Sequence, residues 1–77
     1  MKRQHGEDFF ESEFREDRTD GCAGFDLYRT AGDKKEKVAS VIFWDAMGTY
    51  FIQTFGTDIP LPVAEELIAE TKAAIRE

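Results

Sequence analysis

The sequence predicts an α+β protein with a four-stranded antiparallel meander sheet and one C-terminal helix packed on one face (ββββα). Three observations support this prediction. Two runs rich in β-branched and aromatic residues flank a turn within residues 38–55. Two earlier segments alternate apolar and polar side chains, as half-buried strands do. The last segment follows Pro60 and Pro62 and is rich in helix-forming residues.

The length and composition indicate one small domain covering residues 1–77. A domain of this size buries only about 60% of the surface that its unfolded chain exposes, so its core is small. The single cysteine, Cys22, cannot form an internal disulfide, which favours a reducing compartment. No apolar segment follows the basic residues 1–3, so we expect no signal peptide and no membrane span. A cytoplasmic location is therefore the expectation.

The negative charge lies at the two ends of the chain. Residues 1–20 and 57–77 each carry −3 and residues 21–56 are neutral, which gives the net charge of −6. An acidic surface repels phosphate backbones and anionic membranes. Nucleic acid is therefore an unfavourable partner.

The N-terminal region divides into a polar segment and an alternating one. Residues 1–6 are expected to be disordered. In residues 7–16, uncharged side chains alternate with charged ones: Phe10, Ser12 and Phe14 against Glu11, Glu13 and Arg15. This pattern favours an edge strand with a charged outer face. A helix is the alternative, because Phe10 and Phe14 are also four residues apart.

A half-buried strand is predicted for residues 22–30, where Phe25 and Leu27 alternate with Asp26 and Tyr28. Gly21 and Gly24 are interpreted as glycines at the entry of this strand. The charged residues 31–37 are expected to form a solvated hairpin loop.

The next two strands form a hairpin. A three-residue loop of Ala46, Met47 and Gly48 is preferred, because a short bulged loop needs a left-handed residue and glycine adopts that conformation without strain. This register places Trp44 opposite Tyr50 and Ile42 opposite Ile52. A two-residue loop of Ala46 and Met47 is the alternative, and it would move the second strand's residues to the opposite faces.

A helix over residues 63–75 would be about 20 Å long, enough to cover one face of the sheet and no more. Its apolar stripe comprises Ala64, Leu67, Ile68, Thr71 and Ile75, extended at the entry by Leu61 and Val63. On the sheet, the residues expected to face the helix are Phe25, Leu27, Val41, Phe43, Phe51 and Phe55. The face left open would carry Asp26, Tyr28, Ser40, Ile42, Trp44, Tyr50, Ile52 and Thr54.

Nothing in the sequence indicates catalysis. His5 is the only histidine, which argues against a Ser-His-Asp triad and a Cys/His zinc site. The acidic residues between 7 and 17 lack the spacing and glycine of an EF-hand loop. Asp26 and Asp45 are candidates for paired carboxylates, but Asp45 is better explained as a turn residue. We therefore expect a protein that is not an enzyme and uses no cofactor or metal.

Function is expected to lie on the open apolar face. Large exposed apolar patches on small proteins mark interaction sites, and Tyr and Trp anchor interfaces. The residues predicted to make the interface are Tyr28, Ile42, Trp44, Tyr50 and Ile52. The first interpretation is a homodimer that packs two such faces together. The second is a monomeric platform on which Tyr28, Trp44 and Tyr50 bind a protein, a small planar ligand or single-stranded nucleic acid. In the third, the N-terminal segment folds over the face and leaves nothing exposed.

Overall fold

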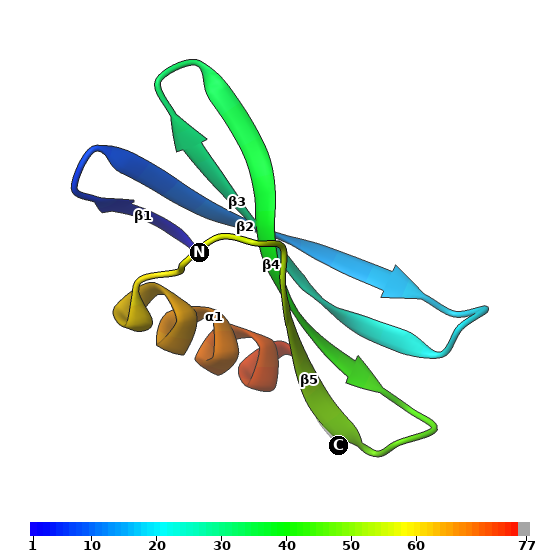
Figure 1. Cartoon of the computed structure of the whole chain (residues 1–77). Coiled ribbons are helices and arrows are strands. Elements are labelled where there is room, and N and C mark those ends of the chain that lie inside the picture. The colour runs from blue at the N-terminus through cyan, green and yellow to red at the C-terminus, as the bar shows by residue number, and fades with distance from the viewer. Residues whose placement is uncertain (76–77) are drawn as a thin grey trace.

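Five antiparallel strands and one helix make up residues 1–75, which are the part of the chain that the computed structural model describes. The elements are β1 (Lys2–His5), β2 (Asp8–Asp17), β3 (Cys22–Ala31), β4 (Lys34–Trp44), β5 (Thr49–Thr54) and α1 (Leu61–Ala74). Each strand pairs with the next, so the sheet is a meander in the order β1-β2-β3-β4-β5 (Figure 1). The α+β class and the antiparallel meander are confirmed, but the sheet has five strands instead of the predicted four.

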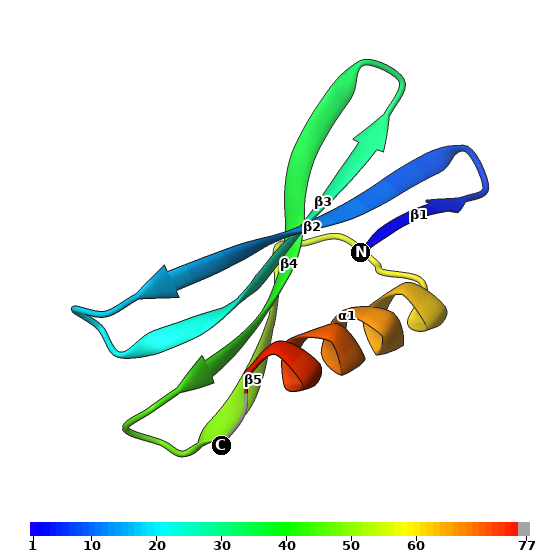
Figure 2. The ribbon, with the colours of Figure 1, turned by 180° about the vertical axis from the view of Figure 1, so that it is seen from behind.

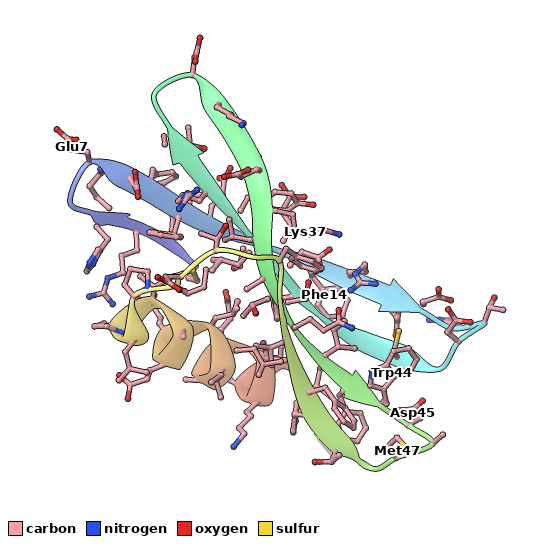
Figure 3. All side chains as sticks on the ribbon, in the orientation of Figure 1. Glu7, Phe14, Lys37, Trp44, Asp45 and Met47 are labelled. Carbon is pink, nitrogen blue, oxygen red and sulfur yellow. The ribbon has the colours of Figure 1, made fainter. Side chains whose placement is uncertain are left out.

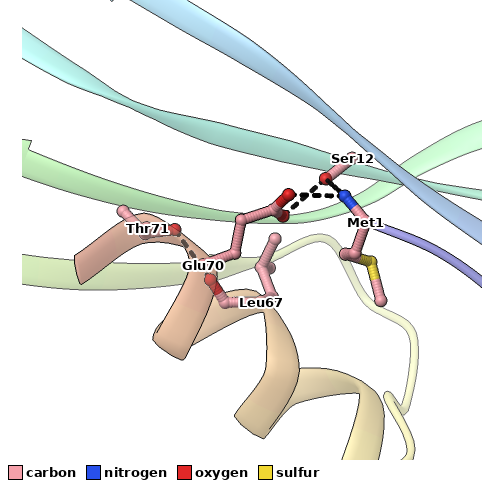
Figure 4. Close-up of polar contacts among 5 residues, drawn as sticks. All are labelled: Met1, Ser12, Leu67, Glu70 and Thr71. Atoms are coloured by element: carbon pink, nitrogen blue, oxygen red, sulfur yellow. Dashed lines mark hydrogen bonds and ion pairs between the residues drawn. The ribbon is translucent and has the colours of Figure 1, made fainter. Parts of the chain in front are cut away.

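The additional strand is β1, in the segment that was expected to be disordered. Its residues pair with β2 from Lys2 opposite Glu11 to His5 opposite Asp8. The α-amino group of Met1 anchors the start of this strand, because it lies 2.5 Å from both the Ser12 hydroxyl and a Glu70 carboxylate oxygen (Figure 4). The Ser12 hydroxyl donates in turn to the other oxygen of Glu70 at 2.6 Å. β1 therefore extends the sheet and does not fold over its open face.

Replacing Glu70 with glutamine is expected to destabilise the fold by about 1 kcal/mol, because the partly buried Met1 ammonium loses its charged acceptor. Urea denaturation monitored by circular dichroism measures this loss. Glu65→Gln is the matched control, since Glu65 lies on the same helix, is exposed and makes no ion pair among residues 1–75. Equal midpoints for the two variants would contradict the anchoring role of Glu70.

The core lies between α1 and one face of the sheet. Leu27, Val41, Val63 and Leu67 are almost fully buried there. Figures 1 and 2 show α1 lying along one side of the twisted sheet, where it packs mainly on β3 and β4. The prediction of a helix on one face is thus confirmed. Leu61, expected to extend the apolar stripe, is instead 69% exposed because it begins the helix beyond the edge of the core.

The strand predicted for residues 7–16 is confirmed by β2, and the strand predicted for residues 22–30 is confirmed by β3. β2 is not the predicted edge strand, however, because β1 pairs with its outer side. The expected loop of residues 31–37 is shorter than predicted, because β4 already begins at Lys34. A β-bulge occurs opposite Leu27 and Tyr28, where Ala39 and Lys37 are the paired residues and Val38 is extra. Val38 and Ala39 consequently both reach the core.

Candidate interaction surface

The register between β4 and β5 decides which side chains remain on the open face. Trp44 lies opposite Thr49 and Ile42 opposite Phe51, so the hairpin loop has four residues, 45–48. Gly48 adopts the positive φ of 67° that was expected for it. The preferred three-residue loop is nevertheless wrong, and the strand register of the alternative, with Trp44 opposite Thr49, is the one observed. The difference of one residue reverses the faces of every β5 side chain.

Two predicted interface residues therefore lie on the helix side of the sheet. The Tyr50 hydroxyl donates to the carbonyl oxygen of Ile75 at 2.9 Å, and the ring meets Phe43 edge to face. Ile52 lies opposite Val41, a core residue, but it remains 52% exposed because β5 is the edge of the sheet. Thr54, which lies opposite Ala39, moves to the helix side as well.

The open face keeps Tyr28, Ile42 and Trp44, as predicted, but Ile42 is only 3% exposed and so offers little surface to a partner. The face also gains two aromatic residues. Phe51 and Phe55, which were expected to face the helix, are 40% and 48% exposed on the opposite side. The sequence held no signal that separated the two registers. Loops of three and four residues both end at residue 48, so a glycine there fits either one.

Charged side chains of the sheet cover the part of the open face around Asp26. Asp26, only 5% exposed, accepts a hydrogen bond of 2.6 Å from the buried Ser40 hydroxyl. Arg15 lies against the same carboxylate, with its Nε 3.1 Å from Oδ2, and Lys37 lies 4.0 Å away. This carboxylate is therefore fully engaged by its neighbours. Asp45 lies five residues beyond Ser40 along the chain, about 16 Å away, so the two carboxylates do not form a catalytic pair.

A second cluster of charged side chains, formed by Lys35, Glu11 and Glu13, lies next to this network toward the tip of the β3–β4 hairpin. The Lys35 amine lies 2.7 Å from Glu11 and 3.5 Å from Glu13, and it also contacts the ring of Tyr28. The hydrogen bond from Lys35 holds the pKa of Glu11 below its ordinary value, and the same bond raises the pKa of Lys35. Tyr28 is thus part of a charged surface and is separated from the apolar residues near Trp44.

The part of the open face near the β4–β5 hairpin is apolar and continues around the edge of the sheet, and the Lys37 amine marks its boundary, 5.8 Å from the centre of the Phe55 ring. We call this apolar surface the hairpin patch and define it by Trp44, Met47, Phe51, Ile52 and Phe55. Four of these residues are between 40% and 66% exposed, namely Met47, Phe51, Ile52 and Phe55. A shallow cavity of about 350 Å³ is lined by Trp44, Met47, Phe51, Ile52 and Gln53. Trp44, Asp45 and Met47 lie near the tip of the β4–β5 hairpin (Figure 3).

A second cavity, of about 380 Å³, lies between the β2–β3 hairpin and the end of α1. Its lining combines apolar residues such as Phe14 and Phe43 with the acidic Glu16, Asp17 and Asp45. Two of these acids already have partners: Asp17 accepts from the amides of Thr19 and Asp20 in its own turn, and Glu16 pairs with Arg18.

Neither a metal site nor a relative points to the function of the described residues. Across residues 1–75, no three His, Cys, Asp or Glu side chains gather in a way that could hold a metal ion. Nor does this part of the chain contain a helix with the length and apolar character needed to cross a membrane. Comparison of the chain with protein-family models, curated proteins and solved structures found no match. Its function must therefore be argued from its own residues.

Proposed function

We propose that this chain is a non-catalytic interaction module that forms a homodimer through the hairpin patch. The observation that carries the proposal is the concentration of exposed large apolar side chains on one hairpin. Met47, Phe51, Ile52 and Phe55 lie within nine consecutive residues and are all at least 40% exposed. Contiguous apolar surface of this kind is uncommon on small monomeric proteins and is typical of interfaces.

Charge favours a second copy as the partner. The chain carries a net charge of −6, yet residues 46–57 contain no charged side chain. Two copies of an acidic protein repel one another wherever their charged surfaces meet, and the neutral hairpin is the region where they approach at least cost. A basic partner would instead be attracted to the acidic segments outside the hairpin.

The size of the chain also supports dimerisation. A stable interface buries about 800 Å² per partner, which is about one sixth of the 5000 Å² that this chain exposes. Small domains have too little core for high stability, and a dimer adds apolar burial that the isolated chain lacks. The free Cys22 and the absence of any disulfide among the described residues fit our proposal of a cytoplasmic location.

A second candidate function is a monomeric binding platform, and the cavity beside Trp44 is the observation that favours it. A small planar ligand could stack on Trp44 and Phe51 there. Tyr50 is not part of this platform, because its ring lies on the helix side. Quenching of Trp44 fluorescence by an added planar ligand, with the chain remaining monomeric, would favour the platform over the dimer.

The Phe51→Ser variant is expected to weaken dimerisation about 30-fold or more, since Phe51 lies at the centre of the hairpin patch. Sedimentation equilibrium over a range of concentrations measures the dissociation constant. Phe14→Ser is the matched control, because Phe14 is a similarly exposed phenylalanine that lies on the helix side of β2. A wild-type chain that stays monomeric at high micromolar concentration would overturn the homodimer proposal.

A further inference from the structure

The outer edge of β5 is unusually suited to pairing with another strand. Within residues 1–75, β5 pairs only with β4, so its other side carries free backbone groups. Proteins protect such edges with charge, proline or short length. The opposite edge, β1, has four residues and carries Lys2 and Arg3. β5 has six residues with neither a charge nor a proline.

The hydrogen bonds of the hairpin indicate which backbone groups point outward. The amide of Phe55 donates to the carbonyl oxygen of Val38 at 3.2 Å, so the backbone of residue 55 points toward β4. In an antiparallel strand this direction alternates from residue to residue. The N–H and C=O groups of Tyr50, Ile52 and Thr54 therefore point away from β4 at the open edge.

We propose that two copies of this chain join by antiparallel pairing of their β5 strands, with Ile52 opposite Ile52 of the second copy. This inference rests on the homodimer proposed above and specifies how the copies meet. Outward groups can bond only to outward groups, so Ile52 must face residue 50, 52 or 54 of the other copy. The arrangement centred on Ile52 uses all three residues on both strands and forms about six backbone hydrogen bonds.

Side chains around this axis are compatible with the pairing. The two Ile52 side chains, each 52% exposed, become neighbours on the helix side of the joined sheet. On the open face, Phe51 of each copy lies opposite Gln53 of the other. No charged residue lies between positions 46 and 57, so no like charges come together across the new pair. The two hairpin patches then form one continuous strip.

Residue-resolved amide hydrogen exchange tests the proposal without altering the chain. At concentrations where light scattering shows a dimer, the amides of Tyr50, Ile52 and Thr54 are expected to exchange at least tenfold more slowly than in the dilute monomer. The amides of Phe51 and Gln53 already point toward β4 and serve as internal controls. A dimer in which residues 50, 52 and 54 still exchange as in the monomer overturns edge pairing but leaves the homodimer intact. A chain that remains monomeric overturns both.

Disulfide trapping gives a second, independent test in a Cys22→Ala background. Directly opposed residues of a hydrogen-bonded antiparallel pair have Cα atoms about 5.5 Å apart, within the range that a disulfide spans. The Ile52→Cys variant is therefore expected to form a covalent dimer under mild oxidation. Thr49→Cys is the matched control on the same strand, because the two copies of residue 49 would lie about 20 Å apart. Cross-linking of Thr49→Cys as efficiently as Ile52→Cys, or no cross-linking of Ile52→Cys in the dimer, overturns the proposal.

Discussion

Replacing Gly24 with alanine is expected to destabilise the fold by about 3 kcal/mol or more, because this position has no space for a side chain. A Cβ atom at Gly24 would lie 2.0 Å from the carbonyl oxygen of Val41 and 2.8 Å from the Cα of Ile42. Both obstacles belong to the backbone of β4, so no change of side-chain rotamer relieves the clash. β3 and β4 would have to move apart at the centre of the sheet.

Urea denaturation followed by Trp44 fluorescence measures the effect of Gly24→Ala. Gly32→Ala is the control, because nothing lies within 4 Å of a Cβ built there and only its positive φ of 64° opposes the substitution. That control is expected to lose about 1 kcal/mol. If Gly24→Ala were no less stable than Gly32→Ala, close approach of the two strands would not explain the glycine.

The role of Gly24 also shows what a single sequence leaves unresolved. The sequence predicts Gly24 at the entry of a strand, yet this residue lies inside β3, opposite Ile42. Strand existence was predictable, because the alternation of apolar and polar residues reports burial on one side. The distance between the backbones of two neighbouring strands leaves no such pattern in the sequence, because it depends on how strongly the sheet twists.

β1 was missed for a related reason. Its residues, Lys2–His5, carry no apolar alternation. The contacts that hold the strand come from charged groups that are distant in sequence: the Met1 amine pairs with Glu70, and Arg3 pairs with Glu66 at 3.0 Å. Apolar periodicity cannot reveal a strand that is fixed by its terminal charge and by ion pairs to a helix.

The candidate surface was predicted in its location but not in all its residues. One helix covers only one face of the sheet in the described chain, and Ile42 and Trp44 lie on the face that it leaves open. The error came from one residue of loop length, which replaced Tyr50 and Ile52 on the open face with Phe51 and Phe55. Ile52 remains in the hairpin patch because it is exposed at the edge of the sheet. Because side chains alternate with a period of two, register is the weakest point of any such prediction.

Replacing Asp26 with alanine is expected to destabilise the fold by about 3 kcal/mol, even though Asp26 lies on the open face. The Ser40 hydroxyl, which is fully buried, would lose its acceptor, and Arg15 and Lys37 would lose the carboxylate between them. A buried hydroxyl without a partner costs about 1–3 kcal/mol. Chemical denaturation of the purified variant gives the change in the free energy of unfolding.

A double-mutant cycle with Ser40→Ala separates this explanation from a general packing defect. Removing the hydroxyl as well removes the unmet hydrogen bond, so the double variant is expected to be about 1 kcal/mol or more stable than the sum of the single losses. Additive losses would mean that the two side chains act independently. If the Asp26→Ala variant unfolded like the wild-type chain, the Asp26 carboxylate would have no structural role and would become a candidate for acid/base chemistry. Its contacts with Ser40, Arg15 and Lys37 argue against that outcome.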